Sequence, residues 1–197
     1  MSMEPVIVNG DSNLSNGHAK KPCRIFVGYD PREDVAYEVC RYSILKRSSI
    51  PVEIIPIKQS ELRKKNYYWR DRGKLESTEF SFTRFLTPFL GGYEGWAMFV
   101  DCDFLYLGDI KELFDLVDQK FAVMFQWLED HEIGSVPFVW NFLVGHNRVL
   151  KDDPSTYPKA IHYTLGGPWF EAWKDCEFGD LWLNELECKV DKDNKME

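Results

Sequence analysis

Apolar and polar residues along the first third of the chain predict a strand, a helix and a second strand. Residues 24–30 form an apolar run that ends in a turn at Pro31. Residues 34–47 carry apolar side chains near helical spacing, and residues 52–57 have the composition of a strand, with Pro56 marking its end or a bulge. The periodic apolar positions of the predicted helix include Val35, Val39 and Tyr42. A strand–helix–strand order of this kind is a βαβ unit, whose two strands are parallel.

The rest of the chain continues the alternation of helices and strands. A helix over residues 80–90 ends at Gly91-Gly92, and an apolar strand over residues 96–100 follows it. Later segments predict helices at 109–117, with Asp109 as N-cap, and at 181–187, and strands at 121–124 and 159–164. We therefore expect an α/β fold: one Rossmann-like domain over residues 22–190, with a mostly parallel central sheet flanked by helices. Residues 1–21 are predicted to be a flexible tail and residues 191–197 a polar tail.

Two aspartates follow the strand at 96–100. Asp101 and Asp103 are separated by one residue, and residues two apart in a strand point to the same face. Two carboxylates about 4 Å apart repel by about 4 kcal/mol at an effective dielectric near 20, and a divalent cation removes that repulsion. Carboxylate oxygens suit Mg²⁺ or Mn²⁺ shared with a substrate phosphate, and ligands of open α/β sheets bind at strand ends. The sequence thus favours a metal–diphosphate site over two solvated loop residues.

His162 is a candidate third ligand of this metal. It ends an apolar run and precedes Gly166 and Gly167, which allow the backbone to approach a bound group closely. A neutral imidazole can complete an oxygen-rich metal site. The alternative is a hydrogen-bonded structural histidine.

Basic residues precede the two aspartates. Arg84 lies on the otherwise apolar helix at 80–90, where it can pair with a phosphate, with one of the two aspartates or with a structural carboxylate. Residues 59–77 are rich in lysine and arginine, Lys74 among them, interleaved with aromatic residues. This segment is either a solvated loop and helix or a flap over an anionic ligand.

An acidic cluster occupies residues 127–134. It lacks the second histidine of a zinc-protease helix, so that motif is rejected. Glu129 and Asp130 are candidate catalytic groups that could orient a sugar hydroxyl or act as nucleophile or base. A solvated acidic turn is the alternative.

Composition narrows the class of protein. The net charge of −8 over 197 residues argues against nucleic acid or an anionic membrane as the main partner. Five scattered cysteines lack metal or disulfide spacing, which favours free thiols and a reducing compartment. No apolar run approaches the ~18 residues of a membrane span, and the first twenty residues do not resemble a signal peptide. These features predict a cytoplasmic protein.

In order along the chain, these motifs resemble a family of nucleotide-sugar glycosyltransferases with the GT-A fold, the glycogenin-like glycosyltransferase family 8. The similarity rests on three segments: residues 82–90 around Arg84, residues 98–103 with the Asp-x-Asp motif, and the Gly-Asp turn at 107–110. It implies a UDP-sugar donor held with Mn²⁺ or Mg²⁺, a retaining transfer, and an unknown glycan, protein or small-molecule acceptor. By this resemblance Val27, Gly28 and Tyr29 hold the nucleoside, Asp101, Cys102 and Asp103 the metal–diphosphate, and His162 is the third ligand.

Two departures from the family pattern bear on catalysis. The segment after His162 is one residue shorter than the family motif and lacks its lysine, which leaves phosphate neutralisation to the metal, backbone N–H groups or a basic residue such as Lys74. The chain also looks abridged near residues 124–125. A nucleotide-sugar-binding remnant without turnover is therefore an alternative function. An Asp-nucleophile phosphatase is disfavoured by the mid-chain motif and by Leu105.

Overall fold

The computed structural model describes residues 6–8, 22–121 and 134–195. Their central element is a four-stranded sheet in the order β1-β3-β2-β4. Its strands are β1 (Val6–Val8), β2 (Cys23–Gly28), β3 (Val52–Ile57) and β4 (Ala97–Val100). The middle strand β2 runs parallel to both β3 and β4, so that Phe26 lies opposite Ile55 on one side and Phe99 on the other. Only β1 is antiparallel. The predicted α/β fold with a mostly parallel sheet is confirmed.

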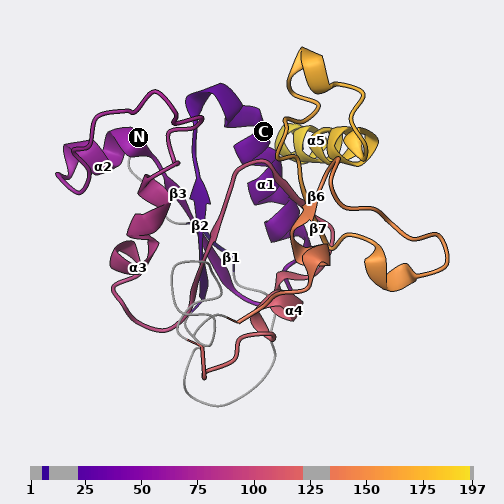
Figure 1. Cartoon of the computed structure of the whole chain (residues 1–197), viewed down its shortest axis with the longest axis horizontal. Coiled ribbons are helices and arrows are strands. Elements are labelled where there is room, and N and C mark those ends of the chain that lie inside the picture. Colours follow the sequence, from indigo (N-terminus) through magenta and orange to yellow (C-terminus); the bar gives the residue numbers. More distant parts are fainter. Residues whose placement is uncertain (1–5, 9–21, 122–133, 196–197) are drawn as a thin grey trace.

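Helices lie on both flanks of this sheet (Figure 1). On one flank are α1 (Asp34–Arg47) and α5 (Gly179–Asn194), which contact each other, and on the other are α2 (Gln59–Lys64) and α3 (Thr87–Leu90). The bounds of α1 and β3 match the predicted ranges. The predicted apolar face of α1 is partly wrong: Val35 is exposed, whereas small and polar positions of the helix are buried. The residues of α1 that reach the core are Ala36, Tyr37, Val39, Cys40, Ser43 and Ile44.

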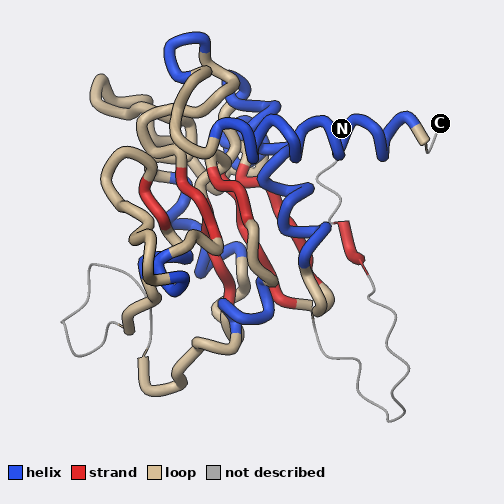
Figure 2. The backbone as a smooth tube through the Cα atoms, turned by 90° about the vertical axis from the view of Figure 1, so that its right-hand side faces the viewer, coloured by secondary structure: helices blue, strands red, loops and turns tan. Residues whose placement is uncertain are grey.

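A second, smaller sheet continues from the end of β4. It contains β5 (Phe104–Tyr106), β6 (Phe142–Leu143) and β7 (Ala160–His162) in the order β5-β7-β6. Strand β5 is antiparallel to β7, and Phe104 lies opposite His162. Figure 2 shows the strands of the molecule side by side. This pairing brings the chain after the Asp-x-Asp motif next to His162, although some 60 residues separate them in sequence.

Short helices make up most of the remaining described structure. The predicted helix at 80–90 consists of a 3-10 helix, η2 (Thr83–Leu86), followed directly by α3. Helix α4 (Ile110–Phe114) begins where predicted, and its N-cap Asp109 accepts a hydrogen bond from the backbone N–H of Lys111. Four further 3-10 turns complete the described elements: η1 (Pro31–Glu33), η4 (Phe138–Trp140), η5 (Pro154–Thr156) and η6 (Glu171–Trp173).

The predicted tails need two corrections. Strand β1 lies within the predicted flexible tail at 1–21 and pairs with β3 through Val6 opposite Ile54. Helix α5 continues to Asn194 and so takes in most of the predicted polar tail at 191–197. The predicted strand at 121–124 and the junction at 124–125 fall largely outside the described residues. Within the described part of the chain, no helix has the length and apolar character needed to cross a bilayer.

Candidate metal centre

Three of the predicted ligands meet at the carboxyl end of β4. Asp101 and Asp103 lie in the turn between β4 and β5, and His162 is the last residue of β7. One ligand atom from each of the three lies within 4.8 Å of the other two. Nε2 of His162 is 3.3 Å from Oδ1 of Asp103 and 4.0 Å from Oδ2 of Asp101. The structure thus brings these three residues together.

The two aspartates converge for a different reason than strand alternation. Strand β4 ends at Val100, so Asp101, Cys102 and Asp103 form a turn. The turn is fixed on the side of the second sheet, because the backbone N–H of Tyr163 donates a 3.0 Å hydrogen bond to the carbonyl of Asp103. Residue Cys102 between them is fully buried in the core. Its side chain is therefore unavailable to a ligand, so a binding role of Cys102 would rest on its backbone and stays a prediction.

The carboxylates are held in an unfavourable state without a cation. Burial, and then the charge of Asp103, raise the pKa of Asp101 from 3.8 to about 6, against the lowering effect of Arg84 and His162. Oδ1 of Asp101 and Oδ1 of Asp103 are both buried, and neither accepts a hydrogen bond from the described residues. Buried oxygens without donors are costly; the charge of Arg84, 3.1 Å from Oδ1 of Asp101, offsets part of that cost, and a bound cation would remove the rest.

Arg84 pairs with the first aspartate. Its Nη2 lies 3.1 Å from Oδ1 of Asp101 and donates a long hydrogen bond of 3.4 Å to Oδ2. The guanidinium also lies over the rings of Phe80 and Phe99, at 5.5 and 5.1 Å from their centroids. Of the partners considered for Arg84 in the sequence, the structure shows the Asp-x-Asp carboxylate. The η2 helix, which carries Arg84, therefore positions the side chain that pairs with Asp101.

Asn141 orients His162 from behind. Its Oδ1 lies 2.9 Å from Nδ1 of His162, and an amide oxygen is an acceptor, so Nδ1 carries the proton and donates it. This tautomer leaves the lone pair of Nε2 directed at the aspartates, the arrangement found for metal-bound histidines. Phe104 stacks on the imidazole at 4.2 Å. Asn141 could not be found from the sequence, because its contact with His162 depends on the β6–β7 pairing.

Glu33 adds a further carboxyl group near the centre. Burial, then the charges of Asp103 and Asp30, raise its pKa from 4.5 to about 7. It ends the η1 turn at the start of α1, and sequence reasoning did not single it out. A half-buried carboxyl group so close to two aspartates adds negative potential to the region that would receive a cation.

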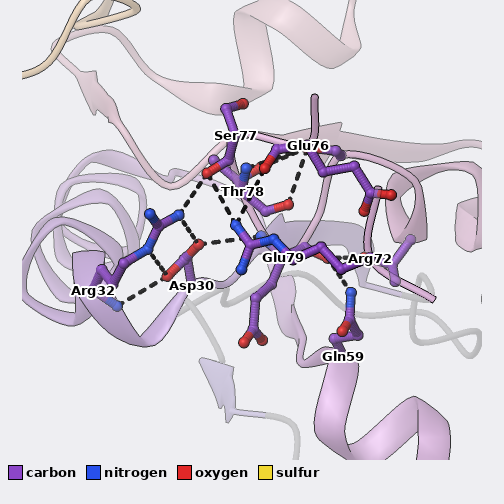
Figure 3. Close-up of polar contacts among 10 residues, drawn as sticks. Asp30, Arg32, Gln59, Arg72, Glu76, Ser77, Thr78 and Glu79 are labelled. Carbon is purple, nitrogen blue, oxygen red and sulfur yellow. Dashed lines mark hydrogen bonds and ion pairs between the residues drawn. The ribbon is translucent and has the colours of Figure 1, made fainter. Parts of the chain in front are cut away.

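The chain after β2 is fixed by an ion pair between the buried Asp30 and the exposed Arg32. Figure 3 shows Asp30 accepting hydrogen bonds from Arg32 and from the backbone N–H of Glu79, at 2.7 to 3.1 Å. Burial alone would raise the pKa of Asp30, but the hydrogen bonds from Arg32 and Glu79 outweigh it and lower the pKa. Nη2 of Arg32 also donates to the carbonyl of Ser77 at 2.5 Å. Residues 76–79 are thereby attached to the edge of the sheet that bears the metal centre.

The predicted nucleoside contacts have unequal access. The side chain of Val27 is fully buried in the core, so it cannot meet a ligand. Gly28 packs on the Phe80 ring, where an added Cβ would lie 2.5 Å from a ring carbon. Tyr29 is half-buried and donates a 2.6 Å hydrogen bond to Asp34. Among the three, the Tyr29 ring is the side chain that remains partly accessible.

The two late glycines serve packing inside their own loop. A Cβ on Gly166 would lie 2.4 Å from Trp173, and one on Gly167 would lie 2.0 Å from Trp169. Gly166 also has a φ of +121°, which side chains rarely adopt. Indole rings thus occupy the space beside these two glycines, and the predicted binding role of the glycines stays a prediction.

The remaining predicted site residues are not brought to the centre. Lys74 is exposed, and within the described residues no contact joins it to the aspartates or His162. The catalytic candidates Glu129 and Asp130 lie outside the described residues, so their role stays a prediction.

The donor set fits a small divalent cation. Ligands at about 2.1 Å from an octahedral ion lie about 3 Å apart when adjacent and about 4.2 Å apart when opposite. The 3.3 and 4.0 Å separations from His162 fall in this range. Two carboxylates and one imidazole suit Mg²⁺ or Mn²⁺ and leave positions for other oxygen ligands.

Comparison with known proteins gives the chain a family. No family model matches it. It is 56% identical to "Protein CDI" of Arabidopsis thaliana in an alignment that covers 97% of each chain. The chain belongs to the Protein CDI family. The alignment with the Arabidopsis Protein CDI runs over 253 positions, whereas this chain has 197 residues. Because nearly all of both chains is covered, Protein CDI contains internal sequence that has no counterpart here.

Proposed function

We propose that this protein binds a nucleotide-sugar, with UDP as the nucleotide, through a divalent metal and acts as a glycosyltransferase of the GT-A type. The observation that carries the proposal is the convergence of Asp101, Asp103 and His162 within 4.8 Å, with two buried carboxylate oxygens that accept no hydrogen bond from the described residues. The resemblance of the surrounding motifs to glycogenin-like glycosyltransferases supplies the substrate class and a retaining outcome.

Each residue of the centre has a distinct role in this proposal. Asp101, Asp103 and His162 hold Mn²⁺ or Mg²⁺, which neutralises the charge that develops on the leaving diphosphate. Arg84 fixes the orientation of Asp101, and Asn141 fixes the tautomer of His162. Tyr29, at the end of β2, is accessible on the side where the proposed nucleoside binds. Glu129 and Asp130 remain the proposed catalytic pair, and the acceptor is a glycan, a protein or a small molecule.

A second candidate function is nucleotide-sugar binding without transfer. It is favoured by the internal sequence of Protein CDI that has no counterpart in this chain. All three proposed ligands are nevertheless present, so the loss would affect the sugar or acceptor site rather than the metal. We place that sequence at the abridged junction near residues 124–125.

Turnover of UDP-sugars separates the two candidates. Release of UDP from UDP-sugars would be followed with Mn²⁺ and with chelator, alongside an Asp103→Ala variant. Asp152→Ala is the matched control, because Asp152 is an exposed carboxylate on the connection between β6 and β7 and is not one of the proposed ligands. Metal-dependent release that is lost in Asp103→Ala and kept in Asp152→Ala supports the enzyme. Metal-dependent UDP binding without release supports the second candidate.

We further propose a cytoplasmic location. All five cysteines are free thiols, including the exposed Cys188. Free thiols are typical of reducing compartments. Alkylation of cysteines in the native protein isolated from cells would show them reduced if the proposal is right, and disulfide-linked if it is wrong.

A further inference from the structure

The charge of this acidic protein is unevenly distributed. The chain has 24 lysines and arginines against 32 aspartates and glutamates. Residues 58–74, however, hold seven lysines and arginines against two carboxylates, Glu61 and Asp71. This segment comprises α2 and the loop after it, on the flank opposite α1 and α5 (Figure 1). A basic region on an otherwise acidic molecule is an electrostatic recognition feature that the net charge conceals.

Five of these seven basic side chains contact groups of the protein itself, namely Lys58, Arg63, Lys64, Arg70 and Arg72, and two do not. Lys65 and Lys74 are exposed, and neither forms an ion pair with a described residue. Lys64 pairs with Glu61 at 2.8 Å, on the surface, where such pairs contribute little. Arg70 lies 3.6 Å from Glu76, whose Oε1 already accepts a 2.6 Å hydrogen bond from the backbone of Gly73. The exposed lysines are therefore free to meet an external anion.

Large apolar side chains protrude from the same loop. Trp69 is 83% exposed and Leu75 is completely exposed. The chain after α2 alternates in burial: Tyr68 packs into the core, while Tyr67 and Trp69 point outward. Extended segments place successive side chains on opposite sides, which explains the pattern. The loop thus presents an indole and a leucine beside its lysines.

Helix α3 extends the aromatic part of this surface. Its Phe89 contacts Tyr67 edge to face at 5.0 Å between ring centroids, and Tyr93 follows at 6.4 Å from Phe89. Tyr93 is 77% exposed. We call the set Lys65, Tyr67, Trp69, Lys74, Leu75 and Tyr93 the basic–aromatic surface. Large apolar side chains are seldom exposed together as a group on a monomeric protein, and such a group indicates an interaction site.

We propose that the basic–aromatic surface docks the protein on an anionic phospholipid membrane. Tryptophan and tyrosine are favoured at the membrane–water interface, because an apolar ring carries a polar group there. Lysines beside them are attracted to acidic headgroups, and a fully exposed leucine can enter the acyl boundary. A protein partner fits less well, because lysine is depleted at protein–protein interfaces.

The position of the surface gives docking a consequence for the metal centre. Phe89 of the aromatic part and Arg84, which pairs with Asp101, lie on the consecutive helices α3 and η2. Docking would therefore engage the stretch of chain that also carries the partner of Asp101. This inference does not depend on the proposed glycosyltransferase activity, since no metal ligand belongs to the surface.

Vesicle co-sedimentation of the full chain tests the proposal. The probes are vesicles of phosphatidylcholine alone and of phosphatidylcholine mixed with phosphatidylserine. The test variants are Trp69→Ser and the double variant Lys74→Glu with Leu75→Ser. The matched control is Lys151→Glu with Leu150→Ser, an adjacent exposed lysine and leucine on the connection between β6 and β7. Both double variants change the net charge equally.

The wild-type protein is expected to sediment with the phosphatidylserine vesicles and to be released by salt. Removal of one lysine charge near an anionic surface weakens binding about fivefold, so we expect the Lys74→Glu, Leu75→Ser variant to bind at least about tenfold more weakly. The control should bind like the wild type. Sedimentation that ignores phosphatidylserine, or a test variant that binds as well as the control, would overturn the proposal. Binding to soluble polyglutamate but not to vesicles would also overturn it, in favour of an acidic protein partner.

Discussion

Nδ1 of His162 lies 2.9 Å from Oδ1 of Asn141, on the side of the imidazole opposite the 3.3 Å approach of Nε2 to Asp103. One hydrogen bond from a neighbouring strand region thus decides which nitrogen of the histidine faces the two aspartates. This relationship makes the metal centre a joint product of both sheets, because Asn141 immediately precedes β6, His162 ends β7 and the aspartates follow β4.

Asn141→Ala should weaken metal binding without unfolding the protein. The variant loses the acceptor that fixes the tautomer of His162, and loss of such partners typically lowers metal affinity about 10- to 100-fold. Calorimetric titration with Mn²⁺ measures the change. Asn147→Ala is the control, since Asn147 also uses its side-chain oxygen to accept a hydrogen bond, but from the backbone N–H of Leu143 rather than from the side chain of a ligand. Equal Mn²⁺ affinity in the wild type and Asn141→Ala would contradict the orienting role.

Arg84→Lys should weaken Mn²⁺-dependent UDP binding, although both residues carry a positive charge. The guanidinium reaches both oxygens of Asp101 and lies over two aromatic rings, and an ammonium group cannot reproduce that planar arrangement. We expect a several-fold loss of Mn²⁺-dependent UDP binding, measured by calorimetry, with the melting temperature checked in parallel. Unchanged UDP binding would show that Arg84 only stabilises the fold.

In the metal-free protein, the contribution of Asp101 to stability should be lost as the pH rises from about 4 to 6. The pKa of Asp101 is raised to about 6 in the folded state, so the folded protein holds a proton that the unfolded chain releases near 3.8. The free energy of unfolding that this bound proton contributes is fully present at low pH, and it is lost as the pH rises through about 6. Asp101→Asn removes the effect and should raise the unfolding free energy of the metal-free protein by about 1–3 kcal/mol at neutral pH.

Melting curves in chelator at several pH values, for the wild type and Asp101→Asn, test this expectation. The difference between the two proteins should be small near pH 4 and grow until about pH 6. Saturating Mn²⁺ should stabilise the wild type and leave the variant nearly unchanged. A constant difference across this pH range would rule out the raised pKa of Asp101 as its cause.

Gly28→Ala should destabilise the protein without touching the metal ligands. The new methyl group would lie 2.5 Å from the Phe80 ring, and overpacking of this kind costs about 1–3 kcal/mol. Chemical denaturation measures the loss, and adding Phe80→Leu to the variant should restore part of it. A destabilisation that Phe80→Leu does not relieve would point to the backbone of Gly28 instead.

The parts of the centre that the sequence predicted are those encoded locally. Asp101 and Asp103 follow an apolar strand, and His162 ends another, so their residue types and spacing sufficed. Asn141 and Glu33 could not be predicted in the same way, because their proximity to the centre comes from tertiary packing. For Gly166 and Gly167, the sequence correctly indicates a close approach to the backbone, but it does not reveal that Trp173 and Trp169 make that approach.

Helix α1 shows the same limit in the fold. Its bounds follow from local pattern, and the structure matches them. Its buried face does not follow from the local pattern, because packing of α1 against β5 and α5 buries Ser43. The Ser43 hydroxyl donates a hydrogen bond to the carbonyl of Cys40 and accepts one from the backbone N–H of Tyr106. A polar residue that binds a neighbouring strand can lie in the core while Val35 stays outside.

Calorimetric titration of UDP in the presence of Mn²⁺ and in the presence of chelator tests the central claim most directly. The account predicts binding that requires Mn²⁺, that is lost in Asp101→Ala and Asp103→Ala, and that survives in the surface control Asp152→Ala. UDP affinity that is the same with chelator as with Mn²⁺, or that persists in both aspartate variants, would contradict it.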